Sequence, residues 1–116
     1  MNHKDLDVWK EAMTLVEMIY AFTKLLPKDE VFNLNSQLRR AAVSVPSNIA
    51  EGCARKSDKE LVNFLYYSIG SLAEIETQLL ISNRIFTLEI DAILNQTEKT
   101  KQILLGLIRY TKNKKQ

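Results

Sequence analysis

The sequence is short of the residues on which most catalytic and metal-binding sites depend. Its 116 residues include one histidine, His3, and one cysteine, Cys53. A lone histidine excludes metal sites built from several imidazoles and most catalytic triads, and a lone cysteine excludes a disulfide within the chain. Cys53 lacks a histidine base, so it is better explained as a small residue near a helix end than as a nucleophile. We therefore expect a protein without enzymatic activity, bound metal or cofactor.

Glycine and proline are also scarce, with three and two residues respectively. Turn-rich all-β architectures and low-complexity chains need many more of them, so long helices are expected instead. No apolar run reaches the length of a membrane span, and the polar N-terminus carries no targeting signal. The chain is long enough for one ordinary domain. These features predict a single cytoplasmic, mostly helical domain that has no membrane partner.

Apolar residues recur at three- and four-residue steps along four segments, a spacing that predicts amphipathic helices. The expected helices cover about 6–26, 34–54, 58–82 and 88–111. Four such helices of similar length, joined by short connections, bury their apolar stripes most simply side by side. The sequence therefore predicts an all-α fold, an antiparallel up-and-down four-helix bundle that spans residues 1–116 as one domain.

The helix ends carry recognisable capping residues. Asn33 and Thr87 precede the second and fourth apolar stripes, where asparagine and threonine can accept a hydrogen bond from a free backbone N–H group. Ser57 and Glu60 have the spacing of a capping box at the start of the third helix. These residues predict where three of the four helices begin.

Pro46 lies inside the second helix, where its ring crowds the carbonyl of Ala42 and no N–H group is available to that carbonyl. We expect a kink at this point or a break into two short helices. A polar face runs beside it, formed by Gln37, Arg40, Ser44, Ser47, Asn48, Glu51 and Arg55. One interpretation is structural: Asn48 and the two serines satisfy the freed carbonyl, and Glu51 neutralises an arginine. The other is that this face serves binding or assembly.

The net charge of +2 is unevenly distributed. Residues 31–60 hold five basic against three acidic residues, and residues 91–116 hold six against two. The hypothesis that follows is a phosphate-binding surface, through which the protein binds RNA, or DNA, by charge and shape rather than by base sequence. Its candidate nucleic-acid-binding residues are Arg39, Arg40, Arg55, Lys56 and Lys59. The alternative is that these side chains form an ordinary solvated surface.

The third helix carries a second apolar strip, turned roughly 100° from its core stripe. The strip consists of Val62, Tyr66, Ile69, Ala73 and Leu80. One interpretation is that a small bundle simply leaves apolar side chains exposed. The interpretation we favour is an interface between copies of the chain, which makes the protein a homo-oligomer.

The stretch Ser44–Gly52, which reads SVPSNIAEG, is the most distinctive part of the sequence. It is preceded by Asp5–Leu6, Val8–Lys10 and Gln37–Ala42, and followed by Phe64–Leu65, Gly70–Leu72, Glu74 and Glu76–Leu79. Over roughly residues 5–82 this ordered set resembles the four-helix-bundle family encoded by intervening sequences in bacterial 23S ribosomal RNA genes. Asn33 stands where members of that family often have glycine.

The resemblance implies a left-handed up-and-down bundle that assembles into a homopentamer and has no known enzymatic activity. The chain is also similar to the accessory proteins of diversity-generating retroelements, pentameric bundles that engage a reverse transcriptase and nucleic acid through basic surfaces. The residues that match the family's pattern are Arg39, Arg40, Ser44, Pro46, Asn48, Glu51 and Gly52. We therefore expect a homopentamer that binds nucleic acid, with a scaffold that binds another protein as the alternative.

Overall fold

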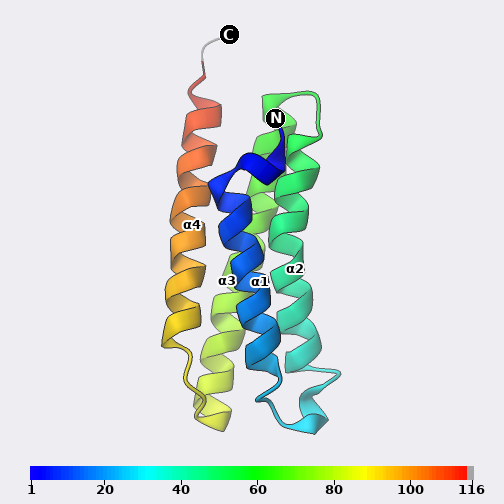
Figure 1. The fold of residues 1–116 in the computed structure, drawn as a ribbon, viewed down its shortest axis with the longest axis vertical. Coiled ribbons are helices and arrows are strands. Elements are labelled where there is room, and N and C mark those ends of the chain that lie inside the picture. Colours follow the sequence, from blue (N-terminus) through cyan, green and yellow to red (C-terminus); the bar gives the residue numbers. More distant parts are fainter. Residues whose placement is uncertain (115–116) are drawn as a thin grey trace.

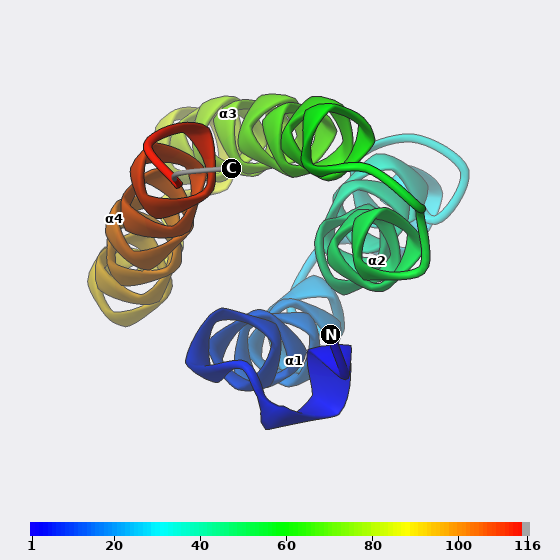
Figure 2. The same ribbon diagram turned by 90° about the horizontal axis from the view of Figure 1, so that it is seen from above.

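The computed structural model describes residues 1–114 and shows an elongated all-α bundle with dimensions of 51 × 22 × 20 Å. Its helices are α1 (Asp7–Thr23), α2 (Leu34–Cys53), α3 (Asp58–Phe86) and α4 (Asp91–Lys112). Successive helices run in opposite directions (Figure 1). Each helix packs against its two neighbours around the bundle, most extensively α2 against α3 (Figure 2). The predicted all-α four-helix bundle is confirmed.

The core consists of the predicted apolar stripes. The largest side chains with almost no exposed surface are those of Leu15, Ile19, Leu38, Ile49, Leu65, Leu72, Ile75, Leu79 and Leu104. Consecutive ones in the same helix are separated by 3, 4, 7 or 11 residues, spacings that place them on one face of the helix. No helix within residues 1–114 combines the length and the apolar character needed to cross a membrane.

The seam between α1 and α4 closes the bundle with a small polar network. Gln96 Nε2 donates hydrogen bonds to Glu11 Oε1, at 2.9 Å, and to the Glu11 carbonyl oxygen, at 3.0 Å. Lys99 Nζ lies 3.4 Å from Glu11 Oε2. The hydrogen bond from Gln96 holds the pKa of the Glu11 carboxyl below its ordinary value, and the Lys99 ammonium acts in the same direction.

Two of the three predicted helix starts differ in detail from the structure. Ser57 is confirmed as a cap, because its Oγ accepts a hydrogen bond from the Glu60 N–H group at 3.1 Å. Asn33 occupies the predicted position, but its side chain does not cap α2. The Glu30 carboxylate accepts the Leu34 N–H group instead, at 3.4 Å. The expected cap at Thr87 is wrong, since α3 continues to Phe86 and Thr87 ends it.

Thr87 adopts a left-handed backbone conformation, with φ of 55°. This conformation is costly for a β-branched residue and free of penalty for glycine. We expect Thr87→Gly to raise the free energy of unfolding by about 0.5–1 kcal/mol, measured by urea denaturation. Thr77→Gly is the matched control, because Thr77 is an exposed residue in the middle of α3. It should lower stability, and a loss of stability in both variants would contradict strain at Thr87.

Pro46 does not divide α2, which is continuous from Leu34 to Cys53. The expected break into two helices is therefore wrong, while the kink stays a prediction. The nearby polar side chains bond other carbonyls than that of Ala42: Ser44 Oγ donates to the Ala41 carbonyl at 2.7 Å, and Asn48 Nδ2 donates to that of Ser44 at 2.9 Å. The interpretation that Asn48 and the two serines satisfy the freed Ala42 carbonyl is therefore wrong.

Candidate nucleic-acid interface

Two basic segments that are far apart in the sequence lie at the same end of the bundle. The turn between α2 and α3 and the carboxyl end of α4 both lie at this end (Figure 1). Lys114 Nζ lies 3.6 Å from Asp58 Oδ2, which ties the two segments together. Between them is a surface depression of about 320 Å³ lined by Asp58, Lys59, Val62, Asn63, Thr111 and Lys112. We call this region, with Arg55, Lys56, Lys59, Lys112 and Lys114, the basic end.

The cations of the basic end differ in whether they already interact with another side chain. Arg55 Nη2 lies 2.9 Å from Glu51 Oε2, and its guanidinium stands 4.8 Å from the centre of the Phe64 ring. Glu51 thus neutralises an arginine, as the structural interpretation of the polar face expected. Lys56 and Lys59 are exposed, and neither forms an ion pair with any residue in 1–114. The two lysines are therefore the cations of the turn that remain open to a phosphate.

The structure does not place Arg39 and Arg40 with the other three predicted binding residues. Arg39 faces α1, where its Nε donates to Thr23 Oγ1 at 2.8 Å and its guanidinium stacks 4.3 Å from the Tyr20 ring centre. Arg40 faces the groove between α2 and α3. Arg40 lies thirteen residues before the end of α2 at Cys53, roughly 20 Å along the helix axis, and Arg55 lies in the turn beyond that end. Arg39 therefore joins two helices, and Arg40 belongs to a second site.

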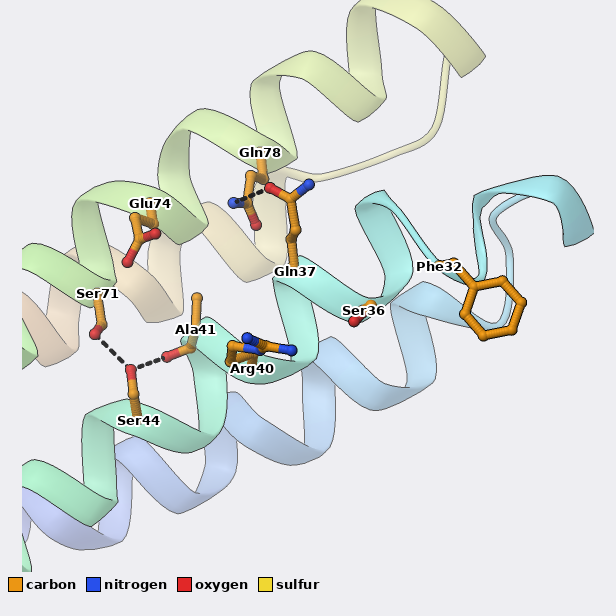
Figure 3. A pocket seen from close by; sticks show the side chains of 9 residues that line it. All are labelled: Phe32, Ser36, Gln37, Arg40, Ala41, Ser44, Ser71, Glu74 and Gln78. Atoms are coloured by element: carbon orange, nitrogen blue, oxygen red, sulfur yellow. Dashed lines mark hydrogen bonds between the residues drawn. The ribbon is translucent and has the colours of Figure 1, made fainter.

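That second site is a polar groove of about 420 Å³ between α2 and α3 (Figure 3). It is lined by Phe32, Ser36, Gln37, Arg40, Ala41, Ser44, Ser71, Glu74 and Gln78. Its two walls are joined at one end by a short hydrogen bond between Ser44 Oγ and Ser71 Oγ. We refer to it as the α2–α3 groove.

The other end of the α2–α3 groove holds a pair of amides. Gln78 Nε2 donates to Gln37 Oε1 at 3.3 Å. Gln78 is only 9% exposed, and its Oε1 atom is buried without a hydrogen-bond donor in the described part of the chain. An unpaired buried carbonyl oxygen is rare in proteins because it loses its hydrogen bonds to water. The groove therefore contains one polar atom whose bonding is incomplete.

Sequence reasoning found one wall of the α2–α3 groove and missed the other. Gln37, Arg40 and Ser44 stand on the predicted polar face of the second helix, whereas Glu74 and Gln78 were not recognised as their neighbours. The signal that could have found them is the polar break that Ser71 and Gln78 make beside the core stripe of the third helix. Its meaning depends on how α2 and α3 align, which the sequence pattern does not specify.

Residues of the types that bind metals do not gather in residues 1–114. No group of three or more His, Cys, Asp and Glu side chains there is arranged to hold a metal ion. Cys53 is half-buried, with its Sγ 3.9 Å from Met1 Sδ. Burial raises the pKa of the Cys53 thiol, which favours the neutral form over the nucleophilic thiolate.

The sequence of the folded chain matches a known family. The model of the 23S rRNA-intervening sequence protein family matches residues 4–108. The chain belongs to this family. No curated protein matches the chain.

A solved structure that shares the fold of this intervening-sequence protein serves for comparison. It is the crystal structure of a protein with unknown function from the S23 ribosomal protein family of Bacteroides thetaiotaomicron VPI-5482. The two superpose with a TM-score of 0.80 at 21% identity, covering 88% of this chain and 98% of the other. At that identity the likeness supports the bundle architecture and carries no information on activity.

The apolar strip of this intervening-sequence protein is only partly free for assembly. Val62 and Ile69 are half-buried and pack against the core beside α4. Tyr66, Ala73 and Leu80 are exposed. Tyr66 and Leu80 each expose 46% of their surface. The predicted interface between copies therefore retains three of its five residues at the surface, and the oligomeric state stays a prediction.

Proposed function

We propose that this intervening-sequence protein is a non-enzymatic homo-oligomer, a pentamer by family resemblance, that binds RNA through its basic end. The observation that carries the proposal is that Lys59 and Lys112, more than fifty residues apart in the sequence, line one depression. The ion pair of Lys114 with Asp58 brings Lys114 to the same place, and Lys56 stands in the adjoining turn. The family description, which refers to intervening sequences of 23S rRNA, favours RNA over DNA.

The chemistry of the basic end suits phosphates more than bases. Lysine ammonium groups on flexible stems act as point charges that attract phosphate oxygens without reading sequence. Each such contact releases counterions from the RNA, so affinity falls as salt rises. In an oligomer every copy repeats the basic end, and several weak contacts to one RNA then add.

Charge reversal at the basic end tests this proposal. In Lys56→Glu with Lys59→Glu, we expect affinity for a short single-stranded RNA to fall about tenfold or more, and the salt dependence to become shallower by about 0.7 per lost contact. The measurement is fluorescence anisotropy of labelled RNA over a series of salt concentrations. Lost phosphate contacts are the reason for both changes.

The matched control reverses two lysines at the opposite end of the bundle. Lys24 and Lys28 are exposed near the carboxyl end of α1, so Lys24→Glu with Lys28→Glu changes net charge equally. This control should alter affinity far less than the variant at the basic end. Equal losses in the two variants would show that net charge alone matters and would refute a localised interface.

A protein-binding scaffold is the second candidate, favoured by the apolar side chains that α3 leaves exposed. These are Tyr66, Tyr67, Leu80, Ile81 and Ile85. A contiguous exposed apolar surface is typical of sites that bind another protein. Absence of RNA binding at low salt, together with a protein that co-purifies with the chain, would favour this alternative.

A further inference from the structure

We infer that the α2–α3 groove holds one unpaired guanine of the bound RNA, between Arg40 and Glu74. This inference rests on the proposed RNA binding and adds the nucleotide that is recognised. Three features of the groove support it: charges of opposite sign on its two walls, an amide oxygen without a donor, and an exposed aromatic ring at its mouth (Figure 3).

The charges on the two walls match the edges of guanine. Arg40 projects from α2 and Glu74 from α3; both are exposed, and neither forms an ion pair within residues 1–114. Guanine offers two adjacent acceptors, O6 and N7, to an arginine, and its N1–H and exocyclic amine are two adjacent donors for a carboxylate. Uracil lacks the donor pair, and adenine places an amine beside N7. Guanine can therefore hydrogen-bond to Arg40 and to Glu74 at the same time.

The amide of Gln78 supplies a further acceptor in the same place. Its Oε1 atom has no donor, while its Nε2 makes one long hydrogen bond, 3.3 Å, to Gln37. Rotation of this side chain toward the groove exchanges that bond for one from the exocyclic amine of guanine. The bound base thereby provides the donor that the free protein lacks.

Phe32 stands at the mouth of the groove, in the segment that precedes α2 (Figure 3). Its side chain is 94% exposed, the highest value among the large apolar residues of the described chain. RNA-binding proteins use such rings as platforms on which unpaired bases stack. We assign Phe32 to the base adjoining the guanine, which places single-stranded rather than double-helical RNA on this face.

Chemically altered RNAs test the assignment. The probes are a uridine-rich oligonucleotide with one central guanosine, the same strand with inosine in its place, and the strand with uridine there. We expect the guanosine strand to bind about tenfold more tightly than the uridine strand, as for one bidentate base contact. Inosine lacks the exocyclic amine and should lose most of this preference. Anisotropy titrations at a single salt concentration measure all three.

Substitutions at Glu74 and Phe32 connect the preference for guanosine to the α2–α3 groove. Glu74→Gln should bring the affinities for guanosine and uridine close together. The control is Glu76→Gln, because Glu76 is an exposed residue of the same helix on the side of α4, and this variant should preserve the difference.

Phe32→Ala should weaken binding of all three strands several-fold, and Phe32→Leu should do the same because it also lacks an aromatic ring. All these side chains are exposed, so thermal unfolding should change little.

The outcomes separate this inference from the proposed function. Equal affinity for the three strands, lost on charge reversal at the basic end, would overturn the guanine site and leave RNA binding intact. No binding of any strand at low salt would overturn both. A fall in molar mass in Phe32→Ala would show that a second copy of the chain occupies the groove, and would likewise overturn the assignment to guanine.

Discussion

Gly52→Ala is expected to lower the free energy of unfolding by about 1–3 kcal/mol, the cost of overfilling a tightly packed site. Gly52 lies where the end of α2 meets the start of α3. A Cβ atom there would lie 2.9 Å from Phe64 Cβ and 3.2 Å from the Leu61 carbonyl oxygen. Both neighbours are fixed to the backbone, so the two helices must move apart. Urea denaturation of the wild type and the variant measures the loss.

Gly70→Ala provides the opposite case in the same fold. Gly70 is exposed in the middle of α3, and a Cβ atom added there meets nothing within 4 Å. Alanine favours the helix over glycine by about 0.8–1 kcal/mol, so this variant should be more stable than the wild type. The same propensity acts at Gly52, where the clash must outweigh it. If both variants gained stability, the close approach of α2 and α3 at Gly52 would be wrong.

Gln78→Met is expected to raise the free energy of unfolding by about 1–2 kcal/mol, because it removes a buried carbonyl oxygen that has no donor. Methionine has a similar length and shape and fills the same space without a polar atom. The measurement is again urea denaturation, with an unchanged m-value as evidence that the folded state remains compact.

Gln37→Met is the control for Gln78, because it removes the partner and keeps the buried amide. Gln78 Nε2 would then lose the acceptor that it has at 3.3 Å, so stability should fall or stay unchanged. A loss of stability in Gln78→Met would mean that the Gln78 oxygen is satisfied in solution. A gain in stability with a loss of the guanine preference would identify Gln78 as a residue that serves binding at the expense of stability.

The fold could be predicted from the sequence because the spacing of apolar residues specifies which face of each helix is buried. The same reasoning failed at Thr87, where a threonine before a new apolar stripe resembles a cap. There α3 runs on to Phe86 and forces the threonine into a left-handed turn. At this position the continuation of α3 to Phe86 outweighs the preference of threonine for the start of a helix.

The candidate sites were harder to predict because they depend on how the helices align. The positive charges of 31–60 and 91–116 were visible in the sequence, but their meeting at one end follows from the antiparallel order and lengths of α2, α3 and α4. To predict the α2–α3 groove, one would also need to know that Gln37 lies opposite Gln78. That pairing depends on the register of α2 against α3. Helical periodicity predicts on which face of its helix a residue lies. It does not predict which residue of the neighbouring helix that residue contacts.

The most direct test of RNA binding by an oligomer is light scattering on a size-exclusion column, with absorbance recorded at both 260 and 280 nm. The protein is mixed with a short single-stranded RNA and run at low and at high salt. We expect a particle of several chains that carries RNA at low salt. At high salt it should release the RNA, while the protein particle keeps the mass of several chains. A single chain that elutes apart from the RNA at both salt concentrations would contradict the account.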